Sequence, residues 1–180
     1  ATLNVVEPMS TGIGGDVFAL IYCKKDEKLH SLNASGWSPK NLTIDYFEEK
    51  GIKEIPLLGI LPVTVPGAVS GFATALERFG TMTLKEVLAP AIHYAENGFP
   101  VSELVSYSWH QAIAKLRSHP ATTKNYLPND RAPRVGELVY FKDLAKTFKI
   151  IAEGGKEAFY NGPIAEAIVR FSDKNEGFLT

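Results

Sequence analysis

The sequence has little of three things: cysteine, an excess of charge of one sign, and long apolar runs. Its single cysteine, Cys23, excludes a disulfide within the chain and leaves the cellular compartment open. The 19 basic and 20 acidic residues give a formal net charge of −1, whereas proteins that bind nucleic acid or membrane surfaces usually carry a basic excess. No apolar run reaches the roughly 20 residues of a membrane-spanning helix. We therefore expect neither nucleic acid nor a membrane as a partner.

The remaining composition is that of a globular domain. Of the 180 residues, 45% are apolar and 22% are charged, which is ordinary for a chain that folds around one core. The chain starts at Ala1 without a methionine, residues 1–6 resemble the last turns of a helix, and the end at 177–180 is apolar. We expect one domain over residues 1–180 that is a fragment of a longer chain, incomplete at both ends. Trimmed termini of a complete protein are the alternative.

The first part of the chain predicts a β-hairpin. Residues 17–22 are an almost continuous apolar, β-favouring run, which is typical of a strand buried on both faces. The charged segment 24–28 forms the turn, and residues 29–34 return as the second strand. Other strand candidates are few: a short run at 63–65 and a weaker one around Tyr140. We expect the first strand to be interior, with its missing neighbours supplied by residues outside this chain.

Helical patterns dominate the later part, because apolar residues recur at helical spacing between capping residues and helix stops. Thr83 and Glu86 are spaced as a capping box, and Pro90 predicts a kink in the helix that follows. Segment 126–136, rich in Pro, Asn, Asp and Arg, is expected to be a surface loop. A hairpin followed by a mainly helical cluster indicates the α+β class. The predicted helices are 43–51, 66–79, 83–97, 102–118, 144–152 and 163–176.

Residues 10–16, Ser-Thr-Gly-Ile-Gly-Gly-Asp, form the most unusual local sequence. A glycine-rich loop cradles phosphate when a strand precedes it and a helix follows it. Here a helix end precedes and a strand follows. We therefore favour a tight, crowded lead into the strand, in which glycine tolerates positive φ, over a phosphate-binding enzyme.

Metal-binding and catalytic patterns are scarce. No histidine pairs with another His, Cys or Glu at metal-ligand spacing, and no Gly-x-Ser-x-Gly elbow occurs. We expect no metal and no cofactor. The stretch 32–39 follows a strand and combines small polar residues with a glycine and an aromatic, which is typical of a pocket wall. A plain strand-to-loop turn is the alternative.

Several ordered stretches resemble the γ-glutamyltransferase family on its large-subunit side. Because these matches keep their order and cover essentially the whole chain, the resemblance is more specific than any one glycine loop. The matching stretches are 5–16, 65–71, 88–92, 97–101, 158–162 and 177–180.

This resemblance implies a fold and a chemistry. Members of the family are N-terminal-nucleophile hydrolases with an αββα sandwich, made as a precursor that cleaves itself into large and small subunits. The threonine freed at the start of the small subunit attacks a γ-glutamyl amide, with its own α-amine as base. The nucleophile lies beyond the matched region, so no residue of this chain is expected to be catalytic. The implied partners are the small-subunit region of the same precursor and an acyl-amide substrate, and a homo-oligomer stays open.

The substrate loop departs from the family pattern. By resemblance, Ser35, Gly36 and Trp37 border the acyl-donor pocket. In typical transferases an arginine of this loop grips the α-carboxylate of the glutamyl group, and aligned on Pro39 that arginine falls at Ser35. The Asn-Ala-Ser-Gly form is more similar to the acylase-like branch, where an arginine often stands in place of Trp37. Neither arginine is present, so the directional guanidinium–carboxylate pair is missing from the predicted pocket.

Two functions follow from these observations. The first is the large-subunit part of an enzyme that hydrolyses γ-glutamyl or related acyl groups from amides, or transfers them. The second is a non-catalytic homologue that acts as a scaffold or binding domain, which the missing arginine slightly favours. Arg131 and Arg134 lie on the predicted loop, and either is a candidate to replace the missing cation.

Overall fold

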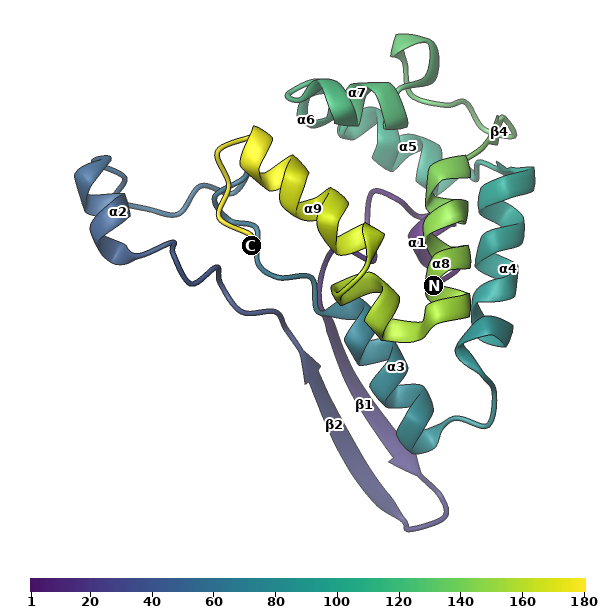
Figure 1. The fold of residues 1–180 in the computed structure, drawn as a ribbon. Coiled ribbons are helices and arrows are strands. Elements are labelled where there is room, and N and C mark those ends of the chain that lie inside the picture. The colour runs from purple at the N-terminus through teal and green to yellow at the C-terminus, as the bar shows by residue number, and fades with distance from the viewer. The chain divides into compact units, whose positions relative to one another are not determined.

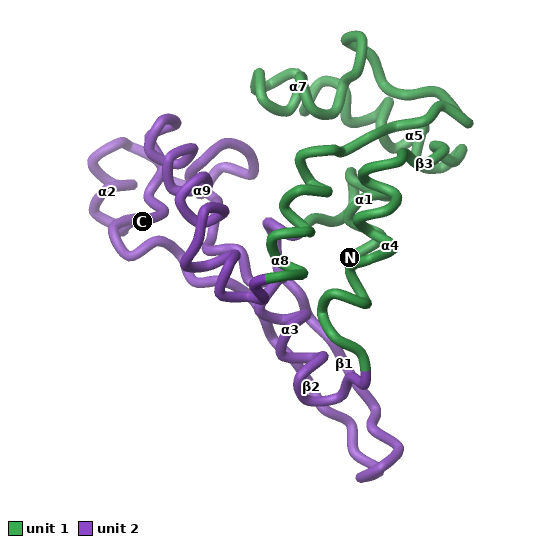
Figure 2. Tube along the Cα trace, turned by 45° about the vertical axis from the view of Figure 1, so that its right-hand side comes forward, with its two compact units in different colours: residues 1–12, 82–153 green, residues 13–81, 154–180 purple.

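The computed structural model describes residues 1–180, which form two compact units (Figure 2). Unit 1 consists of residues 1–12 and 82–153, and unit 2 consists of residues 13–81 and 154–180. Helix α8 (Lys142–Tyr160) contains the second boundary. Within it Gly155 has a φ of 66° and a ψ of −161°, which is not helical backbone. The helix predicted over 144–152 is thus followed by a break at the glycine pair 154–155, and a second helical segment begins after this break.

Unit 2 is built on an antiparallel hairpin of β1 (Val17–Cys23) and β2 (Lys28–Ala34), as the sequence predicted (Figure 1). The register pairs Val17 with Ala34 and Cys23 with Lys28. Helix α3 (Ala68–Phe79) packs on one face of this hairpin. The α3 stripe predicted from apolar spacing is the packed side, because its members Val69 and Ala73 are buried.

The other face of the hairpin is exposed in this chain. Phe18, Leu20 and Tyr22 alternate outward from β1 and are 70%, 74% and 59% exposed. Helix α3 covers only the face opposite to these residues. The expected cover on their side was assigned to residues outside this chain, so the interior position of β1 stays a prediction. The near-continuous apolar run of β1 consists of one packed row and one uncovered row.

The rest of unit 2 is helix and extended chain. Helix α2 (Ile44–Glu49) begins after the predicted cap Thr43, and α9 (Pro163–Lys174) begins with the predicted proline at its first position. Phe171 lies at helical spacing with the apolar residues of α9, but it is 45% exposed. The predicted strand at 63–65 is wrong, because these residues have no regular secondary structure.

Unit 1 contains α1 (Leu3–Val6) packed beside α4 (Leu84–Asn97). The predicted capping box of α4 is confirmed. Thr83 Oγ1 accepts a hydrogen bond from Glu86 N at 3.2 Å, and Glu86 Oε2 accepts one from Thr83 N at 2.7 Å. These bonds to Thr83 hold the pKa of the Glu86 carboxyl below its ordinary value. Pro90 lies inside α4, as expected.

The middle of unit 1 differs from the prediction of one helix over 102–118. The chain instead forms α5 (Glu103–Gln111) and α6 (Ile113–Leu116), with Ala112 ending one and preceding the other. Helix α7 (Pro120–Tyr126) lies in a stretch for which the sequence predicted no element, and the 3-10 turn η1 (Pro128–Asp130) lies inside the predicted loop 126–136.

Trp109 organises the core of this region, which the apolar-stripe prediction missed. Its side chain is fully buried, whereas the nearby apolar residue Leu104 is 74% exposed. Trp109 Nε1 donates to Tyr126 O at 2.6 Å, and its ring stacks on Phe141 with centroids 6.2 Å apart. The buried face of α5 is therefore the one that carries Trp109, and a prediction based on the positions of Leu, Ile and Val residues alone does not identify it.

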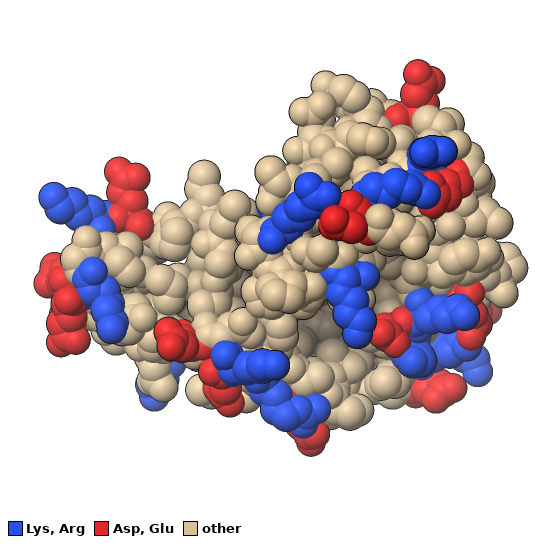
Figure 3. All heavy atoms as spheres, turned by 90° about the horizontal axis from the view of Figure 1, so that it is seen from above, with Lys and Arg blue, Asp and Glu red and all other residues tan.

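A two-residue strand pair completes unit 1. Strand β3 (Phe99–Pro100) pairs antiparallel with β4 (Leu138–Val139). Only β4 lies near the weak strand candidate around Tyr140, and β3 was not predicted. On the face shown in Figure 3, Lys and Arg side chains lie between Asp and Glu side chains, and neither sign gathers in one patch.

Candidate functional site

A cavity of about 370 Å³ opens in unit 2, between the end of β2 and the start of α3. Its walls come from the loop after β2, the segment that leads into α3, the first turns of α3 and the end of α8. The residues that line it are Leu32, Asn33, Ala34, Ser35, Gly36, Trp37, Val65, Pro66, Gly67, Ser70, Gly71, Thr74 and Tyr160.

The loop after β2 packs main chain against main chain. A Cβ atom added to Gly36 would lie 1.5 Å from Val65 O, and one added to Gly67 would lie 2.0 Å from Ala34 O. Val65 N also donates a hydrogen bond to Trp37 O at 2.9 Å. Two segments can approach this closely only where glycine removes the side chain, so Gly36 and Gly67 fix the shape of this wall.

Asp16 connects the glycine-rich segment to the same loop. Its Oδ1 accepts a hydrogen bond from Gly36 N at 2.9 Å, and its Oδ2 accepts one from Ser35 Oγ at 3.4 Å. The neighbouring Gly15 carbonyl accepts hydrogen bonds from the backbone N–H groups of residues 67 and 68, at 3.0 and 2.9 Å. The segment before β1 therefore anchors both the loop after β2 and the start of α3.

The glycines of residues 10–16 act differently from the prediction. None of them has positive φ, and a Cβ on Gly12 or Gly14 would meet no atom within 4 Å. The expected crowding at these positions is wrong for this chain. Crowding occurs instead at Gly36 and Gly67, across the loop that Asp16 and Gly15 hold.

Tyr160 ties the end of α8 to the start of α3. Its hydroxyl donates to Pro66 O at 2.7 Å and accepts from Ser70 N at 3.1 Å. Burial raises the pKa of the Tyr160 hydroxyl, and the hydrogen bond from Ser70 lowers it by less. The phenol thus keeps its proton and can donate and accept at once. Sequence reasoning missed this residue, because its partners lie 90 or more positions away.

The three predicted pocket residues meet at this cavity. Ser35, Gly36 and Trp37 all line it, and Ser35 N is held by Asn33 Oδ1 at 2.9 Å. The Trp37 side chain is 87% exposed, so it stands at the rim and is not packed into the wall. No lysine or arginine lines the cavity. The arrangement offers backbone groups, hydroxyls and an aromatic ring to a ligand, without a cation to pair with an anionic group.

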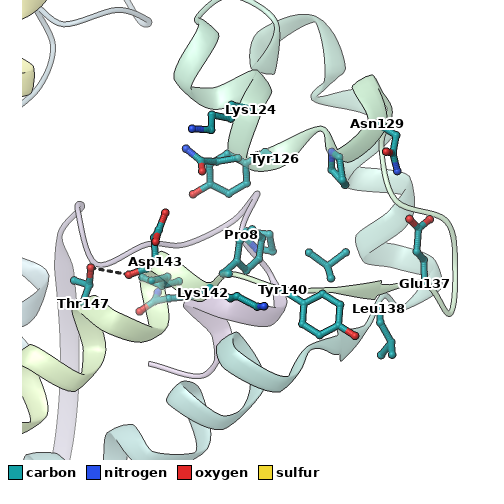
Figure 4. A pocket seen from close by; sticks show the side chains of 16 residues that line it. Pro8, Lys124, Tyr126, Asn129, Glu137, Leu138, Tyr140, Lys142, Asp143 and Thr147 are labelled. Atoms are coloured by element: carbon teal, nitrogen blue, oxygen red, sulfur yellow. Dashed lines mark hydrogen bonds between the residues drawn. The ribbon is translucent and has the colours of Figure 1, made fainter.

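A second cavity, of about 720 Å³, lies within unit 1 (Figure 4). Lys124 and Tyr126 approach it from α7, and Asp143 and Thr147 approach it from α8. Thr147 Oγ1 donates to Asp143 O at 3.1 Å, and burial raises the pKa of the Tyr126 hydroxyl. None of the pocket residues predicted from the sequence belongs to this cavity.

Glu137 binds both arginines of the predicted loop, Arg131 through its guanidinium and Arg134 through its backbone N–H. The Arg131 guanidinium contacts the two carboxylate oxygens at 2.8 and 3.1 Å, and Arg134 N donates to Glu137 Oε2 at 2.9 Å. The hydrogen bonds from Arg131 hold the pKa of Glu137 below its ordinary value. Arg131 would have to leave this bidentate pair before it could bind another carboxylate.

The structure contains no group of three or more His, Cys, Asp and Glu side chains arranged to hold a metal ion. None of its helices combines the length and the apolar character that crossing a membrane requires.

Comparison with known proteins gives the same assignment along the whole chain. The sequence model of the family described as Gamma-glutamyltranspeptidase matches residues 1–180. The glutathione hydrolase-like YwrD proenzyme of Bacillus subtilis (strain 168) is 40% identical over 181 aligned positions, covering 100% of this chain and 34% of the relative. The chain thus spans about a third of the length of this curated relative.

Solved structures are similar as well. The cephalosporin acylase from Bacillus halodurans is 41% identical with a TM-score of 0.93, over 99% of this chain and 34% of that one. The Helicobacter pylori gamma-glutamyltranspeptidase is 31% identical with a TM-score of 0.92, over 99% of this chain and 52% of that one. The predicted α+β fold, part of an N-terminal-nucleophile hydrolase, is confirmed by these neighbours.

Proposed function

Because the chain belongs to the gamma-glutamyltranspeptidase family, we propose that it is the large-subunit part of an enzyme that hydrolyses acyl groups from amides or transfers them. Both compact units belong to this one segment. The relatives named as proenzymes support a precursor whose remaining part supplies the small subunit. The nucleophile belongs to that remaining part, so this chain contributes walls of the acyl-donor pocket and no catalytic group.

The cavity in unit 2 is the proposed acyl-donor site, and the observation that carries this proposal is the loop after β2. Ser35, Gly36 and Trp37, the residues expected to border the donor pocket, all line that cavity. Asp16, Gly15 and main-chain contacts hold the loop in place before any ligand arrives. Such preorganisation favours binding, because little conformational freedom is lost when the ligand enters.

The donor class follows from the charge of the cavity wall. A charge-assisted hydrogen bond contributes roughly 1.5–3 kcal/mol, and this wall has no lysine or arginine to form one with a substrate carboxylate. We infer that γ-glutamyl donors lose about one to two orders of magnitude in affinity relative to an arginine-bearing site. The exposed Trp37 ring provides apolar surface at the rim, which favours a bulkier or less polar acyl group.

A non-catalytic scaffold is the second candidate, and the absence of a cation from the cavity wall is the observation that favours it. The full-length gene product separates the two functions. If the protein is an enzyme, mass spectrometry of the purified material should show two fragments that together account for the full-length chain. The second fragment should begin with threonine at the self-cleavage site. That material then hydrolyses at least one acyl anilide. An uncleaved, inactive full-length protein would establish the scaffold instead.

A further inference from the structure

Asp16 bears a negative charge that no cation of the chain compensates. Both of its hydrogen-bond partners at the loop, Gly36 N and Ser35 Oγ, are neutral donors, and Asp16 takes part in none of the ion pairs of the structure. Both partners line the unit 2 cavity, where there is no lysine or arginine either. Asp16 does not itself line the cavity, but its carboxylate is bonded directly to two residues that do, so it places a negative charge behind this part of the wall.

We propose that Asp16 is a specificity-determining positioning residue, which holds Ser35 and Gly36 at the cavity rim and disfavours acyl donors that carry a carboxylate at that end. Neutral and cationic donors are the favoured class. The selectivity rests on the proposed function, whereas the anchoring of the loop does not.

The anchoring follows from the geometry of the carboxylate. One oxygen accepts from the backbone of Gly36 at 2.9 Å, and the other faces the hydroxyl of Ser35 at 3.4 Å. A carboxylate has about four lone-pair sites, so the same group spans two consecutive loop residues and still has acceptor capacity. Its negative charge attracts a cationic group of a donor bound at the rim and repels a second carboxylate there.

Two substitutions distinguish the hydrogen bonds by which Asp16 holds the loop from the effect of its negative charge. Asp16→Asn keeps an oxygen that accepts from Gly36 N but removes the negative charge, and Asp16→Ala removes both. Asp45→Asn is the matched control, because Asp45 lies in the first turn of α2 and outside the cavity. All variants are made in the full-length protein.

Hydrogen–deuterium exchange of the peptide over residues 33–38 tests the anchor. We expect Asp16→Ala to speed exchange in this peptide by about tenfold, as the loss of roughly one hydrogen bond predicts. Asp16→Asn and the control should stay within about threefold of the parent. Unchanged exchange in Asp16→Ala, or equally fast exchange in the control, contradicts the anchoring.

Donor kinetics test the charge. A matched pair of acyl anilides, one with a carboxylate on the acyl chain and one without, is compared at low and high salt. We expect Asp16→Asn to raise kcat/KM for the carboxylate-bearing donor by about two- to fivefold, the range for an exposed charge interaction. The neutral donor should gain less than the carboxylate-bearing donor, and salt should erase this difference between the two donors because it screens exposed charges.

The outcomes are distinct. Equal changes for both donors, or a difference that salt leaves intact, contradict the selectivity. A full-length protein that hydrolyses neither donor contradicts the proposed function and the selectivity together, while the exchange measurement still decides whether Asp16 holds the loop. If Asp16→Ala does not fold, the loop has lost its anchor, and Asp16→Asn carries the kinetic test.

Discussion

At the scale of single residues, the site depends on contacts between segments far apart in the sequence. The strand end with small polar residues is typical of a pocket wall, and the family resemblance singled out Ser35, Gly36 and Trp37, which line the unit 2 cavity. That this cavity takes the acyl donor stays a proposal. Asp16 and Tyr160 were not predicted, because they act through hydrogen bonds to residues 20 and 90 or more positions away. Local spacing carries no information on such partners.

Gly36 should tolerate no side chain. A Cβ there would lie 1.5 Å from Val65 O, and the obstructing atom is main chain, which cannot rotate away. We expect Gly36→Ala to lower the free energy of unfolding by about 2 kcal/mol or more, as overpacking typically does. Chemical denaturation measures this change. Gly14→Ala is the control and should stay near the parent, since no atom lies within 4 Å of its Cβ position; equal losses would refute the explanation.

Tyr160→Phe should loosen the start of α3. The variant leaves Pro66 O without its donor and Ser70 N without its acceptor. We expect a loss of about 1 kcal/mol in the free energy of unfolding, measured by urea denaturation, with faster amide exchange at the first turn of α3. Tyr107→Phe, at a side chain that is 62% exposed, serves as the control. An equal effect of both variants would rule out the bridging role.

At the scale of elements, helix ends were predicted correctly where the capping residue and its partner lie close together in the sequence. The capping box at Thr83 and the first-position proline of α9 were predicted because their partners lie within one turn. The pair β3 and β4 was not predicted, because two residues are too few for a periodic pattern. That residues outside this chain cover the exposed row of β1 stays a prediction, because an apolar side chain reveals a preference for burial and not which segment supplies the cover.

The ion pair beside β4 gives unit 1 a defined response to acid. Arg131 holds the folded-state pKa of Glu137 below its ordinary value of about 4.3. The pair therefore contributes stability above that value, and the contribution is lost as the pH falls through the folded-state pKa. We expect Glu137→Gln to be less stable than the parent at pH 7 and to approach it near pH 2.

Thermal unfolding at several pH values checks this expectation. Glu153→Gln is the control, because Glu153 is exposed and belongs to no ion pair of the structure. It should follow the parent at every pH. A gap between Glu137→Gln and the parent that stays constant from pH 7 to pH 2 would show that the pair does not carry the acid response.

At the scale of the whole molecule, we expect activity to depend on residues outside this chain. The 180 residues cover about a third of the length of the similar proenzymes, and Phe18, Leu20 and Tyr22 have no cover within unit 2. We expect the isolated chain to hydrolyse no acyl anilide, because pocket walls alone do not supply a nucleophile. Activity that persists in the rigorously purified chain and disappears with a substitution inside it would overturn this account.

The most direct test of the central claim is a donor comparison on the full-length, processed protein. The ratio of kcat/KM is measured for a γ-glutamyl anilide and for the analogue that lacks the α-carboxylate, in the parent and in Ser35→Arg. The account predicts little or no preference for the carboxylate in the parent and a preference of about tenfold or more in Ser35→Arg, because the variant adds the missing cation. A strong parent preference for the carboxylate-bearing donor would contradict it.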